Sequence, residues 1–84
     1  MSIMVYLENI RKENDLMYCD YYREVDYIKK ENVKPFKLVY NYITREIIDT
    51  SEDNISGYAY HASRKLQRLS KMEIIPSSAK EIWY

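Results

Sequence analysis

Residues 55–72 carry the pattern that most constrains the fold, an apolar stripe with helical spacing. Its members recur three or four positions apart and are Ile55, Tyr58, Ala62, Leu66 and Leu69. This spacing places them on one face of an α-helix. Candidate caps for its start are Asp53, Asn54 and Ser56, and Pro76 prevents its continuation. An amphipathic helix buries its apolar face against a second layer, so we expect the remainder of the chain to supply that layer.

The remainder of the chain is rich in β-branched and aromatic residues, which favours strands. The expected strands are residues 3–7, residues 16–22, the two arms of a hairpin over residues 36–50, and residues 80–84. Polar residues 11–15 predict a turn between the first two strands, and residues 43–45 predict the turn of the hairpin. Residues 24–34 fit an edge strand, a loop or a short helix.

Together these elements predict an α+β fold in which a small antiparallel sheet packs on one amphipathic helix, in the order ββββαβ. The length of 84 residues fits a single domain spanning residues 1–84. The alternative is an all-α bundle, because apolar residues of the hairpin segment also share a helical face. These residues are Phe36, Tyr40, Ile43 and Ile47.

Charge and cysteine content exclude several classes of protein. Thirteen basic and thirteen acidic residues cancel, so net charge predicts no general affinity for nucleic acid or anionic membranes. Cys19 is the only cysteine, which excludes an intramolecular disulfide. The first residues lack the pattern of a secretory signal, and no apolar run approaches the roughly 18 residues of a membrane span. We therefore expect a cytoplasmic protein that does not bind membranes.

Motifs for catalysis, metals and cofactors are missing from the sequence. One histidine and one cysteine do not make a tetrahedral zinc site, and a single glycine excludes phosphate-binding loops. Cys19 and His61 are the only thiol–imidazole pair. A buried strand cysteine and a surface helix histidine explain them more simply. We expect a protein that is not an enzyme and has no cofactor or metal.

The predicted helix has a basic face, formed by Arg64, Lys65, Arg68 and Lys71. Residues 55–72 hold these four basic residues and no acid, while the remaining residues hold nine basic and thirteen acidic residues. Such asymmetry suits phosphates or an acidic protein surface, although a single charged helix face is commonly only solvated. The basic face is therefore one candidate contact surface.

A second candidate surface is the aromatic–acidic region, formed by Tyr18, Asp20, Tyr21, Tyr22 and Glu24. In a strand, Tyr18 and Tyr22 share one face and Tyr21 points to the other. Ten tyrosines are too many for so small a core, so we expect part of this set to face outward. Exposed tyrosine is enriched in protein interfaces, and the acidic neighbours favour a basic protein partner over nucleic acid.

Several short motifs resemble small uncharacterised proteins of phages and mobile elements. They are Cys19-Asp20-Tyr21-Tyr22, Thr44-Arg45-Glu46-Ile47, His61-Ala62 with Arg64-Lys65-Leu66, Pro76, and Trp83-Tyr84. The resemblance covers most of the chain. It implies a small binding protein that modulates a larger host or defence complex.

The sequence thus predicts a small non-enzymatic protein-interaction module that binds and modulates a larger macromolecular complex. Inhibition of that complex is one kind of modulation that this prediction includes. The alternative is a nucleic-acid-binding accessory protein that uses the basic face of helix 55–72. A tyrosine-rich edge strand also allows a homodimer through a continuous sheet.

Overall fold

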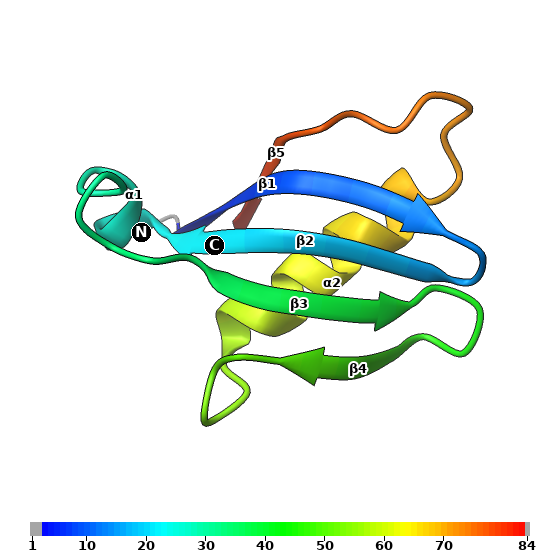
Figure 1. Ribbon diagram of the computed structural model, residues 1–84, viewed down its shortest axis with the longest axis horizontal. Helices are drawn as coiled ribbons and strands as arrows, with labels where there is room; N and C mark the ends of the chain where they lie inside the picture. The colour runs from blue at the N-terminus through cyan, green and yellow to red at the C-terminus, as the bar shows by residue number, and fades with distance from the viewer. Residues whose placement is uncertain (1–2, 84) are drawn as a thin grey trace.

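Five antiparallel strands form one sheet in the order β4-β3-β2-β1-β5 (Figure 1). The computed structural model describes residues 3–83. Its elements are β1 (Ile3–Glu13), β2 (Leu16–Arg23), α1 (Glu24–Tyr27), β3 (Phe36–Asn41), β4 (Glu46–Thr50), α2 (Gly57–Leu69) and β5 (Ala79–Trp83). The predicted α+β fold is confirmed, with four strands, a main helix and a last strand. The all-α alternative is wrong.

The first hairpin is longer and tighter than predicted. Polar residues 11–13 were assigned to a turn, but they continue β1 and pair with β2 as far as Glu13 opposite Leu16. Only Asn14 and Asp15 remain in the turn. Asn14 has a φ of 55°, in the left-handed region that asparagine tolerates well. A two-residue turn of this kind suits the twist of paired strands, which is why the pairing extends so far.

A β-bulge interrupts β1 between Glu8 and Arg11, where the register against β2 shifts. Asn9 adopts a φ of 53°, and the adjacent Ile10 is buried. Without the extra residue, the side chains beyond Leu7 would change faces of the sheet. The bulge therefore delivers Ile10 to the same buried face as Leu7, and the Ile10 amide donates to the Ser77 carbonyl at 3.0 Å.

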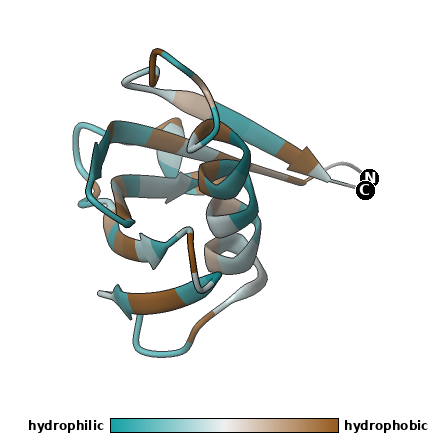
Figure 2. Ribbon diagram, turned by 90° about the vertical axis from the view of Figure 1, so that its right-hand side faces the viewer, coloured by the Kyte–Doolittle hydropathy of each residue, from teal (hydrophilic) through white to brown (hydrophobic). Residues whose placement is uncertain are grey.

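The helix α2 covers one face of the sheet, here called the inner face (Figure 2). The buried sheet residues beneath it are Val5, Leu7, Ile10, Met17, Cys19, Tyr21, Leu38 and Tyr40. The helix contributes Ala59, Ala62, Leu66 and Leu69 to the same core. Two alanines in this set let the helix axis lie close to the sheet. The predicted apolar stripe is thus confirmed for Ala62, Leu66 and Leu69, and Tyr58 packs partly buried against the core. Its first member was predicted wrongly, because Ile55 precedes α2 and is exposed.

The opposite or outer face of the sheet is covered at one end by the segment after β2, which forms the short helix α1. Tyr27 of α1 stacks on Tyr6 with ring centroids 3.9 Å apart and contacts Tyr22 edge-on at 5.7 Å. Lys30 forms an ion pair with Glu8 at 3.0 Å. Residues 24–34 are therefore a short helix and turns, which decides among the three alternatives left open by the sequence.

The ends of α2 lie inside the predicted range of 55–72. Ser56 occupies the N-cap position, but no cap residue makes a side-chain bond to the helix backbone. The Ser56 hydroxyl instead donates to Glu52 at 3.0 Å. Of the three candidate caps Asp53, Asn54 and Ser56, the structure therefore selects Ser56 by position. The last strand was predicted at residues 80–84, and Tyr84 lies outside the described residues.

Candidate functional site

The aromatic–acidic region is mostly buried, which corrects the expectation of an exposed surface there. Tyr21 lies on the inner face with 0% of its surface exposed and belongs to the core. Asp20 and Tyr22 lie on the outer face, at 6% and 8% exposure. Their burial results from long-range neighbours that strand parity alone does not reveal.

Asp20 is a buried anion that is fully partnered within the sheet. Its carboxylate accepts a hydrogen bond from the side-chain amide of Asn9 at 2.7 Å and forms an ion pair with the Lys37 ammonium at 2.9 Å. These two partners come from β1 and β3, the strands on either side of β2. A buried carboxylate needs such partners to offset its lost hydration. Asp20 therefore serves the fold of the outer face.

The remaining members of that region are only partly accessible. Tyr18 is half-buried, with the Arg11 guanidinium 5.1 Å from its ring centroid. Tyr22 lies beneath Tyr27, and Glu24 is half-buried in the first turn of α1. The structure thus separates the five predicted residues between two faces and does not unite them in one patch.

The basic face of α2 is partly engaged within the fold. Arg64, Arg68 and Lys71 are exposed, and Lys65 is half-buried. Arg68 forms an ion pair with Glu81 of β5, so its charge is already partnered. Lys71 follows the end of the helix. Arg64 lines a cavity and, unlike Arg68, forms no ion pair with any residue among 3–83.

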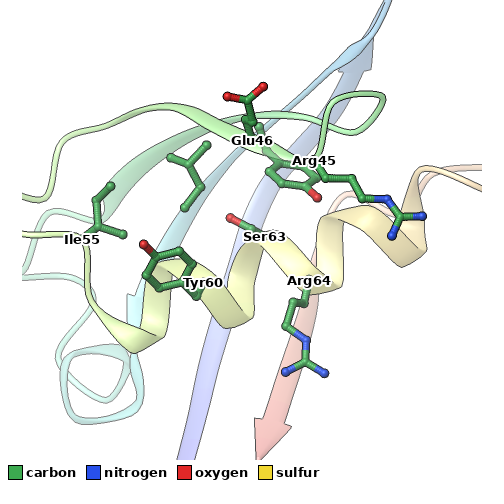
Figure 3. Close-up of a pocket in the computed structure, with 8 residues that line it drawn as sticks. Arg45, Glu46, Ile55, Tyr60, Ser63 and Arg64 are labelled. Carbon is green, nitrogen blue, oxygen red and sulfur yellow. The ribbon is translucent and has the colours of Figure 1, made fainter.

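A groove runs between α2 and the β3–β4 hairpin (Figure 3). Its larger part is a cavity of about 420 Å³ lined by Tyr40, Arg45, Glu46, Ile47, Ile55, Tyr60, Ser63 and Arg64. A second part of about 280 Å³ is lined by Tyr40, Arg45, Arg64, Gln67 and Arg68. The two parts share three lining residues, and together they are called here the α2–β4 groove.

The helix positions the groove residues by its periodicity. Tyr60, Arg64 and Gln67 lie three or four positions apart and therefore share one side of α2. The buried Ser63 donates its hydroxyl to the Ala59 carbonyl at 2.9 Å, so its polar atom is satisfied within the helix. At the base of the groove the Tyr40 hydroxyl donates to the Gln67 side chain at 2.8 Å. This bond ties α2 to β3 and fixes the floor.

Arg45 enters the groove from the turn between β3 and β4. The turn is held by the Arg45 amide, which donates to the Asn41 carbonyl at 2.8 Å. The Asn41 side-chain oxygen accepts from the amides of Ile43 and Thr44, both at 2.9 Å. Arg45 has a φ of 63°, where glycine or asparagine is the usual residue. A left-handed residue with a side chain costs about 1–2 kcal/mol.

Like Arg64, Arg45 forms no ion pair with any residue of the described range 3–83. In Figure 3, Ile55 and Tyr60 mark one end of the groove, while Arg45 and Arg64 lie toward the other. The Glu46 carboxylate points away from α2. The groove therefore has an apolar end and, toward its other end, two arginines without a salt bridge to any residue among 3–83. In Figure 3 the Arg45 side chain lies by the hairpin, while the Arg64 side chain extends past α2 on the side away from the hairpin.

Sequence reasoning placed Arg45 in a turn but did not include Arg45, Ile55 or Tyr60 in a site. Tyr60 was visible as a tyrosine one turn before Arg64 on the helix. Nothing in the sequence alone, however, brings a turn residue beside α2. That proximity follows from the packing of α2 on β3, whose end leads into the turn that carries Arg45.

His61 packs against an aromatic ring, and Cys19 is buried in the core. The His61 ring stacks on Trp83, with centroids 3.7 Å apart and planes 7° apart. Burial raises the pKa of the Cys19 thiol to about 12, and the nearby Asp20 adds to this effect. The reactive thiolate is therefore disfavoured. Within residues 3–83, no three His, Cys, Asp or Glu side chains come together to hold a metal ion.

His61 predicts a pH dependence of stability. Partial burial, followed by the Arg64 charge, lowers the pKa of His61 below its ordinary value of 6.5. The folded state then binds fewer protons than the unfolded state, so the His61 contribution is complete above about pH 6.5 and is lost as the pH falls toward the lowered pKa. We expect the melting temperature, followed by Trp83 fluorescence, to drop as the pH falls below about 6.5.

His61→Phe is the matched control, because it keeps an aromatic ring against Trp83 and removes the titrating group. This variant should lose the part of the pH dependence that belongs to His61. An identical drop in both proteins would contradict the assignment.

The fold and groove define a two-layer α+β protein with a mixed apolar and basic surface groove. No family model, curated protein or solved structure matches the chain. Among residues 3–83, no helix has the length and apolar character needed to cross a membrane.

Proposed function

We propose that this chain is a small non-enzymatic interaction module that binds another protein through the α2–β4 groove and thereby modulates a larger complex. One observation carries the proposal: two arginines without ion-pair partners in the described chain flank an apolar cavity of about 420 Å³. A cytoplasmic location and a phage or mobile-element origin belong to the same proposal and are supported by the sequence.

The residue types around the groove support a protein partner. Tyr60 is 57% exposed and Ile55 is 47% exposed, although both are large apolar side chains. Ile43 and Ile48 of the neighbouring hairpin are exposed as well. Isolated exposed apolar residues are ordinary, but tyrosine and arginine beside a cavity are the residue types that dominate binding energy in protein interfaces.

The edge of the sheet beside the groove adds backbone groups to this surface. β4 is an outermost strand, so one of its sides has no strand neighbour. Its register against β3 skips Ile48, which forms a bulge. Because a bulge limits regular strand pairing, we expect a partner to use β4 over a short stretch and to depend mainly on the groove.

The nucleic-acid alternative rests on the basic face of α2, where Arg64, Arg68 and Lys71 are exposed. Engagement of Arg68 by Glu81 weakens this alternative, because it lowers the charge available to phosphates. Nucleic-acid binding would show a steep fall of affinity with salt, with a slope of about one unit per phosphate contacted. A fall of affinity with salt that is much shallower than this favours the protein partner.

The experiment is site-specific photo-crosslinking in nuclease-treated host lysate. A photoreactive phenylalanine analogue replaces Tyr60 in the groove or, as the control, Ile28, which is exposed on the α1 side of the molecule. We expect one discrete protein to crosslink from position 60 and not from position 28. With that protein purified, Tyr60→Ala should weaken binding about tenfold or more, as for an interface hot spot. Equal crosslinking from both positions, or unchanged affinity for Tyr60→Ala, would remove the groove as the contact surface.

A further inference from the structure

We infer that the α2–β4 groove accepts an acidic peptide segment, with carboxylates on Arg45 and Arg64 and one large apolar side chain against Ile47, Ile55 and Tyr60. This inference rests on the proposed function and specifies the chemistry of the partner.

The positive charge of the groove favours an anionic ligand. The smaller part of the groove is lined by Tyr40, Arg45, Arg64, Gln67 and Arg68, a set that contains three guanidinium groups and no carboxylate. Arg68 shows that an arginine of this groove pairs with a carboxylate, because its own partner is Glu81. Arg45 and Arg64 lack an equivalent partner within residues 3–83. Guanidinium groups pair with carboxylates through two parallel hydrogen bonds.

The surroundings favour carboxylates on a peptide over the phosphates of a nucleic acid. Glu46 lines the larger part of the groove, and Asp49 is exposed on the same edge strand. A nucleic acid carries a charge at every nucleotide and would approach these acids. A peptide can instead carry acidic residues only at the positions that face the arginines. The net charge of zero for the whole chain adds no long-range attraction for a polyanion.

The apolar end of the groove favours an apolar side chain of the bound peptide. Ile47 is half-buried on the inner face of β4, while Ile55 and Tyr60 are exposed beside it. Covering these three side chains with an aromatic or aliphatic residue removes their apolar surface from water, which is the main favourable term in association. The arginines at the other end then fix the orientation of the segment.

The backbone of Arg45 fits this assignment. A turn that needs a left-handed residue would be more stable with glycine, yet arginine occupies the position with a φ of 63°. Backbone strain of this kind concentrates at functional sites. Among residues 3–83, Arg45 is the residue with a left-handed φ that is neither glycine nor asparagine, and it is one of the two groove arginines without an ion-pair partner in that range.

The test uses NMR titration of the ¹⁵N-labelled protein with three synthetic peptides. The first has a central phenylalanine flanked by glutamates, the second replaces the glutamates with glutamines, and the third replaces the phenylalanine with alanine. We expect the first peptide to shift the amide signals of Arg45, Ile47 and Arg64, and the other two to bind about tenfold more weakly.

Two variants then assign the binding to the arginines. Arg45→Gly removes the guanidinium and relieves the turn, so it should melt at or above the temperature of the natural chain while binding the acidic peptide about tenfold more weakly. Arg64→Gln should weaken binding similarly. The control, Lys29→Gln with Lys34→Gln, removes two positive charges from exposed positions outside the groove and should leave binding unchanged.

Several outcomes overturn the inference. Equal binding of the glutamine peptide does so, as does an equal loss of affinity in the lysine control. Tighter binding of a DNA or RNA oligonucleotide to the same residues would assign the groove to nucleic acid. If the amide signals of the groove residues shift with protein concentration in the absence of peptide, the groove binds a second copy of the chain. If the partner crosslinked at position 60 needs Tyr60 but not Arg45 or Arg64, the proposed function stands and this inference fails.

Discussion

Replacing Tyr21 with alanine is expected to lower the free energy of unfolding by about 3–5 kcal/mol, the cost of removing a large buried ring. Tyr21 is fully buried on the inner face, and its ring centroid lies 5.4 Å from that of Phe36. At about 0.05–0.15 kcal/mol per residue, a chain of 84 residues has a total stability of only about 4–13 kcal/mol. Tyr21→Ala therefore unfolds much of the population if the total stability lies near the lower end of this range.

Tyr21→Phe separates the hydroxyl from the ring. The Tyr21 hydroxyl donates to the Glu52 carboxylate and lies 3.3 Å from the Thr50 hydroxyl. Burial and the bond to Glu52 raise the pKa of Tyr21, so the hydroxyl stays protonated as a donor. Losing this donor should cost about 1–3 kcal/mol. Urea unfolding followed by circular dichroism measures both variants, and equal stabilities for phenylalanine and alanine would contradict the packing role of the ring.

Leu66→Ala is the second large effect. Leu66 is fully buried at the centre of the contact between α2 and the inner face. Its removal should cost about 2–5 kcal/mol, the exact value depending on how far the sheet and helix close around the space. The denaturation midpoint should fall while the slope with urea stays constant.

The matched control for Leu66 lies two residues earlier on the same helix. Arg64 is exposed, so Arg64→Ala should change the stability by no more than about 0.5 kcal/mol. Similar losses in the two variants would mean that α2 is not held by the apolar stripe. Because Arg64→Ala is expected to fold normally, the same protein also serves in binding assays.

The helix and the second hairpin were predictable because their signals are local. The spacing of Ala62, Leu66 and Leu69 is enough to define the buried side of α2. The hairpin over residues 36–50 is confirmed as β3 and β4, and its signal was two runs of aromatic and β-branched residues separated by a short turn. Each of these features depends on neighbours within a few residues of the same segment.

The outer face and the groove depend on contacts between distant segments, and this is why the sequence did not reveal them. Tyr22 is buried by Tyr27, whose segment allowed three structural readings. The register shift near Asn9 changes which residues of β1 face the helix. The site combines a residue of the β3–β4 turn with residues of α2, so Arg45 gains its significance only once the sheet and helix have packed.

The pairing of β1 with β5 has a consequence for synthesis on the ribosome. The two strands join from Ile3 opposite Trp83 to Leu7 opposite Ala79, so β1 pairs with a strand that is translated only after all the other elements between them. At about 5–20 residues per second, β5 follows β1 after roughly 4–15 seconds. During this interval the nascent chain displays one side of β1 as an open edge, and His61 and Tyr58 have no Trp83 to pack against. A chaperone can therefore bind β1 before β5 emerges, and a translation product truncated before β5 exposes an edge of β1 that is paired in the folded sheet.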